Sequence, residues 1–158
     1  MTQKLYSPSW QDIEKDCQIL AKKIKSIPDL MVAITKGGLP IAVILANKYF
    51  DHPPIITLQL KEVQTEGQAD YQAKKVKLIS PLNAYPIKNK TVLIIDDVAD
   101  SGASLKEAAD IVKTHQPKSL TIATLHYKPR TIIKPDLFVK KISDNVWINY
   151  PWEQKIRP

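Results

Sequence analysis

Residues 92–105 read Val-Leu-Ile-Ile-Asp-Asp-Val-Ala-Asp-Ser-Gly-Ala-Ser-Leu, and this stretch indicates the fold of the chain. A short apolar run ends in two adjacent carboxylates, Asp96 and Asp97, and a third, Asp100, precedes a small turn that contains hydroxyls. The run is typical of a buried strand in an open α/β sheet, where ligands bind at the carboxyl ends of the strands. Acidic side chains suit sugar hydroxyls and a hard cation, and the backbone N–H groups of a helix start suit a phosphate. We therefore expect a nucleotide-type site at residues 96–104.

A purely structural interpretation of this stretch is a buried strand followed by a polar turn and a helix cap. It accounts for Ser101 or Ser104, because a serine hydroxyl can cap the exposed amides of a helix start. It does not account for three carboxylates at one strand end, since like charges repel unless a cation or a ligand compensates them. The functional interpretation explains more of the residues.

The stretch resembles the phosphoribosyl-diphosphate (PRPP) signature of type I phosphoribosyltransferases. In that signature an apolar strand leads to two acids, a third acid three residues later, and then a hydroxyl, a glycine, any residue and a second hydroxyl. The resemblance implies a magnesium ion bound through Asp97, a 5′-phosphate in the Ser101–Ser104 loop, and Asp100 as the general base that also contacts the purine. The PRPP-binding residues implied here are Asp96, Asp97, Val98, Ala99, Asp100, Ser101, Gly102, Ala103 and Ser104.

A second anion-binding turn is expected at residues 35–38, Thr-Lys-Gly-Gly, between a predicted strand and a predicted helix. Two glycines let the backbone approach an anion closely, although a Gly-Gly turn alone is a weak signal. In the resembling family this loop holds pyrophosphate next to a non-proline cis peptide, which implies such a peptide at Thr35–Lys36. Relatives usually carry arginine where Lys36 stands, so the backbone amides are expected to matter more here. Lys36 and Gly37 are the PRPP contacts implied in this turn.

The C-terminal third resembles the bacterial xanthine-guanine phosphoribosyltransferases. The resembling elements are Tyr127-Lys128-Pro129, Trp147-Ile148 and Pro151-Trp152-Glu153. With the two phosphate turns, the resemblance covers nearly the whole chain and is weakest in residues 61–90. It implies a pocket for an oxo-purine base in the segment of about residues 127–158.

Besides Asp100, three residues are implied as purine-binding. Lys128 would donate to the 6-oxo group, which favours oxo-purines over adenine, whose 6-amino group is itself a donor. Trp147 would stack on the ring, and backbone near Ile148 would meet its other edge. Alone, a lysine at a strand end is more often solvated and a tryptophan is more often core. Because the PRPP signature is present, we interpret Lys128 and Trp147 as base-binding residues instead. Trp10 and Trp152 are interpreted as packing residues.

Helical and strand patterns alternate along the chain, which predicts an α/β fold: a mostly parallel twisted sheet flanked by helices, with a small C-terminal hood for the base. Residues 61–75 are polar and carry Gly67, so we expect a mobile loop or hairpin that closes over the site, with Lys74 as a PRPP contact. The predicted strands are 30–35, 55–60, 76–79, 91–97, 120–125 and 137–142, and the predicted helices begin at Trp10 after Ser9, at Leu39, and after the signature.

Length and composition favour one soluble domain, residues 1–158, in a reducing cytoplasm. The net charge of +7 permits nucleic-acid binding, but the lysines are spread along the chain, so small-molecule substrates and no nucleic acid are expected. No apolar run reaches the length of a membrane span, and the N-terminus lacks the apolar stretch of a signal peptide. Cys17, the only cysteine, lies on an apolar helix stripe and is predicted to be core. The resemblance also implies a homo-oligomer, a dimer or a tetramer.

These patterns predict a purine salvage enzyme that transfers 5-phosphoribosyl from PRPP to guanine, xanthine or hypoxanthine and releases pyrophosphate. One alternative is a transcriptional regulator that senses PRPP on the same fold, although no appended DNA-binding helix pair is visible in the sequence. A second is the same fold acting on adenine, orotate or uracil, which Lys128 and Trp147 disfavour. An unrelated α/β domain is the third. The sequence does not rank the three oxo-purines.

Overall fold

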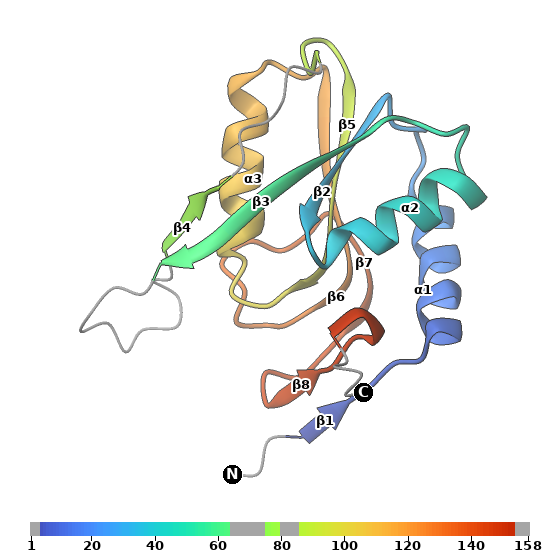
Figure 1. Cartoon of the computed structure of the whole chain (residues 1–158), viewed down its shortest axis with the longest axis vertical. Coiled ribbons are helices and arrows are strands. Elements are labelled where there is room, and N and C mark those ends of the chain that lie inside the picture. Colours follow the sequence, from blue (N-terminus) through green and yellow to red (C-terminus); the bar gives the residue numbers. More distant parts are fainter. Residues whose placement is uncertain (1–3, 64–74, 80–85, 154–158) are drawn as a thin grey trace, which may run out of the picture.

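A computed structural model describes residues 4–63, 75–79 and 86–153, and its centre is a six-stranded sheet (Figure 1). The strand order is β4-β3-β2-β5-β6-β7, and every neighbouring pair is parallel except the antiparallel pair β3 and β4. This arrangement confirms the predicted α/β class. The strands are β2 (Leu30–Thr35), β3 (Ile55–Val63), β4 (Lys75–Leu78), β5 (Thr91–Ala99), β6 (Ser119–Tyr127) and β7 (Leu137–Lys141).

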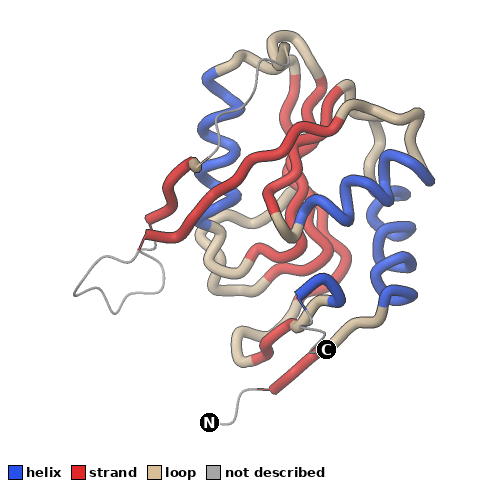
Figure 2. Tube along the Cα trace, viewed as in Figure 1, coloured by secondary structure: helices blue, strands red, loops and turns tan. Residues whose placement is uncertain are grey.

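Three helices cover the two faces of the sheet (Figures 1 and 2). Helices α1 (Trp10–Lys23) and α2 (Gly38–Lys48) lie on one face, and α3 (Ala103–Thr114) lies on the other. Alternate residues of a strand serve the two faces: Met31 belongs to the core under α1 and α2, and Val32 belongs to the core under α3. Parallel strands that are covered on both sides need such continuous apolar runs, which explains why β2 and β5 contain almost no polar residue before their carboxyl ends.

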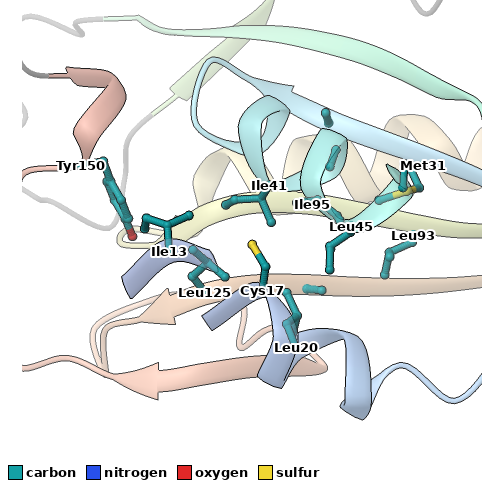
Figure 3. Packing of buried hydrophobic residues seen from close by; sticks show 14 of the residues in the cluster. Ile13, Cys17, Leu20, Met31, Ile41, Leu45, Leu93, Ile95, Leu125 and Tyr150 are labelled. Carbon is teal, nitrogen blue, oxygen red and sulfur yellow. The ribbon is translucent and has the colours of Figure 1, made fainter. Parts of the chain in front are cut away.

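Helix α1 begins where the sequence predicts, because Ser9 and Asp12 form a capping box. Asp12 N donates to Ser9 Oγ at 3.2 Å, and Ser9 N donates to Asp12 Oδ2 at 2.9 Å. Cys17 lies inside the core with no exposed surface, beside Ile13 and Leu125 (Figure 3). Burial raises the pKa of its thiol to about 12, so the prediction of a core cysteine is confirmed.

A second, two-stranded sheet forms the predicted C-terminal hood. Strand β8 (Val146–Ile148) pairs in parallel with β1 (Lys4–Tyr6), and a short 3-10 helix, η2 (Pro151–Glu153), follows. Tyr150 projects from this hood into the core under α1 and α2 (Figure 3). The hood is therefore anchored by a buried aromatic side chain. Only the later part of residues 127–158 belongs to the hood, because β7 is part of the main sheet.

Several boundaries differ from the sequence prediction: β5 continues to Ala99 and β6 to Tyr127, and the predicted loop 61–75 is shorter at both ends. Residues 61–63 continue β3 and residue 75 opens β4, so these ends of the predicted loop 61–75 are strands of an antiparallel hairpin. The hairpin alternative is thus correct at its base, where Lys61 pairs with Lys77 and Val63 pairs with Lys75. Lys74 lies outside the described residues. No helix in the described parts of the chain has the length and apolar content of a membrane span.

Candidate active site

The two predicted anion-binding turns meet at the carboxyl ends of neighbouring strands. Strand β2 pairs with β5, so the turn after β2 lies beside the acids at the end of β5. A Cβ atom added to Gly37 would lie 2.1 Å from Asp97 Oδ2, and one added to Gly38 would lie 2.1 Å from the carbonyl oxygen of Ile95. A side chain at position 38 would overlap the backbone of β5, and one at position 37 would force the Asp97 carboxylate to move. The Thr35–Lys36 peptide is cis, and the Lys36 side chain is exposed.

The carboxylates at the end of β5 lie in an environment that disfavours negative charge. Burial, and next the charge of Glu153, raise the pKa of Asp97 to about 7. Burial, and next the charge of Asp97, raise the pKa of Asp96 well above its ordinary value. Carboxylates with raised pKa values in a cleft are typical of functional sites. This cluster would be stabilised by a cation.

The donor set fits a magnesium ion that is held partly by substrate. Among the described residues, no group of three or more His, Cys, Asp or Glu side chains is arranged as a metal cage. Mg²⁺ is usually bound through one or two carboxylates together with substrate phosphates and waters. A buried Asp97 carboxylate with a raised pKa, 8% exposed and in contact with the Gly37 turn, meets that requirement.

The predicted phosphate loop, Ser101–Ser104, leads into α3. Gly102 adopts a left-handed conformation, with φ of 81°, and no side chain caps the first turn of α3. The Ser101 hydroxyl accepts a hydrogen bond from Ala103 N at 3.3 Å. Gly102, the N-cap residue, offers no side chain to the amides that follow Ala103, and such amides at the start of a twelve-residue helix form a suitable site for an anion. Ala99 is buried in the core under α3, so only its backbone can serve a ligand, whereas the partly buried Val98 also lines the cavity described next.

A cavity of about 70 Å³ lies beside the acids and brings together the four residues predicted to bind the purine. Lys128 is 2% exposed, and its Nζ lies 3.2 Å from Asp100 Oδ1. The Trp147 ring centroid is 6.0 Å from that Nζ, and half of the Trp147 side chain is exposed. The cavity is lined by Asp97, Val98, Asp100, Lys128, Trp147, Ile148, Tyr150 and Glu153.

Arg130 is a site residue that the sequence interpretation missed. Its Nε donates to Asp100 Oδ1 at 2.8 Å, and its Nη2 donates to the same oxygen. Its backbone N donates to Asp144 Oδ1 at 3.2 Å. The available signal was a basic residue two positions after Lys128, in the turn that follows a strand of the site.

Trp152 does more than pack, which corrects the sequence interpretation. It stacks on Tyr150, with the ring centroids 4.8 Å apart, and packs against Trp10. Its Nε1 also donates to Asp97 Oδ2 at 3.3 Å. An indole N–H needs an acceptor when it is partly buried, and here the acceptor is the acid that faces Gly37.

A chain of buried polar groups continues behind Asp97. The Tyr150 hydroxyl donates to the Asp97 carbonyl oxygen at 3.1 Å and contacts His126 Nδ1 at 2.8 Å. His126 Nε2 lies 3.6 Å from Asp16 Oδ2, and Lys140 Nζ is 2.8 Å from Asp16 Oδ1. Burial tends to raise the pKa of Asp16, but its contacts with His126 and Lys140 outweigh burial and lower it. The hood, β5, β6 and α1 are thereby joined through one network.

Replacing Tyr150 with phenylalanine is expected to lower the free energy of unfolding by about 1–3 kcal/mol, because His126 and the Asp97 carbonyl each lose a buried partner. Chemical denaturation measures this loss. Tyr49→Phe, at a half-buried position outside the network, serves as the matched control. Equal stabilities of Tyr150→Phe and the wild type would show that the network contributes nothing to the fold.

A larger cavity, about 390 Å³, opens at the other end of the strands, near the amino ends of β5 and β6. Lys23, Thr91, Ser119 and Asp136 are among the residues that line it. None of the residues predicted to bind PRPP or purine reaches it, so its size does not make it the candidate active site.

Known proteins agree with this arrangement. Residues 9–155 match the family model of the phosphoribosyl transferase domain. The chain is 30% identical to the xanthine-guanine phosphoribosyltransferase of Ruegeria sp. (strain TM1040), over 98% of this chain and 89% of that protein. Its structure resembles that of a purine phosphoribosyltransferase from Pyrococcus horikoshii, with a TM-score of 0.82, 28% identity, and coverage of 98% of this chain and 97% of that one.

A protein from Neisseria gonorrhoeae, solved with bound ppGpp, has a TM-score of 0.81 and 25% identity, and the match covers 98% of this chain and 92% of that one. The full-length match to the family model, the similar relative and the two convergent loops lead to one conclusion. This chain belongs to the phosphoribosyltransferase family.

Proposed function

We propose that the protein transfers the 5-phosphoribosyl group of PRPP to guanine, xanthine or hypoxanthine, with release of pyrophosphate. The observation that carries this proposal is the contact of Asp97 with Gly37, which joins the acidic strand end to the second anion-binding turn. The cavity that contains Asp100, Lys128 and Trp147 opens beside this junction. The site thus offers neighbouring places for a diphosphate, a sugar phosphate and a planar base.

The phosphates and the sugar are bound by backbone and acid groups. The amides of residues 36–38 bind the pyrophosphate group, and the Ser101–Ser104 loop binds the 5′-phosphate at the start of α3. Asp96 and Asp97 bind the ribose hydroxyls. Both phosphate ends are fixed, so the anomeric carbon is held between leaving group and base, and such positioning contributes several kcal/mol. Asp97 would hold a magnesium ion, which would supply positive charge to offset that of the diphosphate leaving group.

The base is oriented and activated by the cavity residues. Lys128 donates to the 6-oxo group, and Trp147 stacks on the ring, for about 1–3 kcal/mol. Asp100 accepts the proton from the imidazole nitrogen that attacks the sugar. Without this acceptor, positive charge would build on the purine as the bond forms, and general base catalysis typically supplies about 10²–10⁴-fold.

The similar proteins support this assignment more than the regulator alternative. The Ruegeria relative is named for xanthine and guanine, and the Pyrococcus neighbour for purines. The ppGpp on the Neisseria neighbour contains a guanine base, which has the 6-oxo group that Lys128 is proposed to bind. Nothing in the described fold or in these relatives supports a transcriptional regulator. The enzyme is further proposed to be one domain that acts in the cytoplasm as a homodimer or homotetramer. The segment that connects β3 to β4, which includes Lys74, is proposed to close over PRPP.

Lys128→Met is expected to lower kcat/KM for guanine and hypoxanthine by about 10²-fold, because the 6-oxo group loses its buried donor. Initial rates with guanine, xanthine, hypoxanthine and adenine measure this effect, and the wild type is expected to use adenine poorly. Lys134→Met, which removes a lysine from the neighbouring turn, is the control and should match the wild type. A wild type that prefers adenine, or a Lys128→Met enzyme with unchanged kcat/KM, would contradict the proposed pocket.

A further inference from the structure

Arg130 occupies the proposed general base in a way that the proposed reaction does not explain. Two of its N–H groups donate to Asp100 Oδ1, and Lys128 Nζ lies 3.2 Å from the same oxygen. A carboxylate oxygen has two lone pairs, so three donors leave no lone pair on Oδ1 for the N–H of a purine. Asp100 must therefore release one of these partners before Oδ1 can accept a proton.

Of the two cations, Arg130 has the freedom to move. The Lys128 side chain is 3% exposed and lines the base cavity, where it is proposed to donate to the purine. The Arg130 side chain is 28% exposed, so it can change rotamer without disturbing the core. The Nε and Nη2 groups of Arg130 both donate to one oxygen of Asp100, whereas such a pair of donors is best satisfied by two parallel bonds to two oxygens. A better acceptor for the fork would displace it.

The backbone that carries Arg130 packs on the proposed phosphate loop. Ile132 N donates to the carbonyl oxygen of Ser101 at 2.9 Å. A Cβ atom added to Gly102 would lie 2.3 Å from Thr131 Oγ1, so the turn and the loop are in direct contact. Asp100, the present partner of Arg130, immediately precedes that loop. A phosphate bound there would therefore lie close to the guanidinium.

The phosphate loop itself contains no positive side chain. Residues 101–104 offer amides and hydroxyls only. Lys106, in the first turn of α3, forms an ion pair with Asp110, with 2.7 Å between Nζ and Oδ2. A phosphate monoester carries close to two negative charges at neutral pH and pairs with arginine through two parallel hydrogen bonds. Arg130 is thus well placed to provide the cation that this loop lacks.

We propose that Arg130 binds the 5′-phosphate and alternates between two partners: Asp100 in the free enzyme, and the phosphate in the complex with PRPP or the nucleotide product. The inference rests on the proposed function and adds a residue to it. Moving to the phosphate exchanges a singly charged partner for a more highly charged one. It also frees Oδ1 of Asp100, so binding of the sugar phosphate prepares the base for the incoming purine.

The test compares a nucleotide with its nucleoside. Calorimetric titration with GMP and with guanosine is carried out on the wild type, Arg130→Met and Lys134→Met. Arg130→Met is expected to weaken GMP binding by about 10–100-fold and to leave guanosine binding within about twofold, since only GMP carries the phosphate. Lys134 lies on the same turn, with its Nζ 5.3 Å from the Phe138 ring centroid, and controls for loss of one charge. Both affinities of Lys134→Met are expected to stay within about twofold of wild type.

Two results would overturn the inference: unchanged GMP affinity in Arg130→Met, or an equal loss for GMP and guanosine, which would place Arg130 at the base instead. If circular dichroism shows that Arg130→Met is unfolded, Arg130→Lys replaces it. That variant keeps the charge but loses the fork, and a loss for GMP alone is again required. A wild type that binds no GMP would overturn the proposed function, and this inference with it, whereas tight wild-type binding without an Arg130 effect overturns the inference alone.

Discussion

Replacing Asp100 with asparagine is expected to lower kcat by about 10²–10⁴-fold, the usual contribution of a general base. Asparagine has nearly the same shape, and its carbonyl oxygen can still accept hydrogen bonds from Arg130 and Lys128. It cannot take a proton from the attacking purine. The loss therefore belongs to the chemical step, and KM for PRPP is expected to change much less than kcat.

Single-turnover rates with PRPP and guanine measure this effect, and circular dichroism establishes that the variant is folded. Asp110→Asn removes an exposed carboxylate of α3 that pairs with Lys106, so it tests whether loss of a nearby charge alone slows the reaction. That control is expected to retain wild-type turnover. An Asp100→Asn enzyme with more than half of the wild-type turnover would exclude Asp100 as the base.

Replacing Asp97 with asparagine is expected to have two opposite effects: turnover falls by about 10²-fold or more, and the free protein becomes more stable. The first follows because the asparagine amide would be a poorer ligand for the magnesium ion that Asp97 is proposed to hold. The second follows because the Asp97 carboxylate is buried beside Glu153, which makes its ionised form costly in the free protein. Asparagine keeps the volume that packs on Gly37 without the charge.

The sign of the pH dependence follows from the raised pKa. Asp97 has a pKa of about 7 when folded, against an ordinary value of 3.8, so the folded state binds its proton more tightly than the unfolded state does. Protonation of Asp97 therefore stabilises the folded state fully at pH values below 3.8, and this stabilisation is lost as the pH rises through about 7. Three pKa units correspond to about 4 kcal/mol, an upper bound for the gain from asparagine.

Urea denaturation of the wild type and Asp97→Asn in EDTA, from pH 4 to pH 8, measures this difference. The stability gained by Asp97→Asn is expected to be small at pH 4 and to grow up to pH 8. Asp136→Asn, which changes an exposed acid that accepts a hydrogen bond from Ile122 N outside the site, is the control and is expected to show no such increase. If Asp97→Asn raised the free energy of unfolding equally at every pH, or lowered it at pH 8, the Asp97 charge would not be destabilising in the free protein.

The local patterns of the sequence predict most of the main fold. Apolar runs identify every strand of the six-stranded sheet, and the Ser9 capping box identifies the start of α1. Because strands alternate with helices, β2 and β5 are expected to be parallel, and they are neighbours in the sheet with their carboxyl ends together. The two anion-binding turns that follow these strands are therefore adjacent. The roles of the residues in those turns remain predictions that the variants above address.

The sequence could not reveal features that depend on contacts between distant residues. Strands β1 and β8 are three residues each, too short for a visible period, and they lie at opposite ends of the chain. They pair all the same, and Lys4 N donates to the carbonyl oxygen of Asn145 at 3.1 Å. Trp152 looks like a packing residue because its acceptor, Asp97, belongs to another strand. Arg130 becomes notable only once the turn after β6 is seen against Asp100.

The central claim is that this site joins a sugar phosphate to an oxo-purine. ³¹P NMR of the wild-type protein with PRPP, guanine and Mg²⁺ tests it most directly. The expected result is consumption of PRPP with equimolar appearance of GMP and pyrophosphate, and no reaction when guanine is left out. Persistence of PRPP in the complete mixture, or its conversion to ribose 5-phosphate without GMP, would contradict the account.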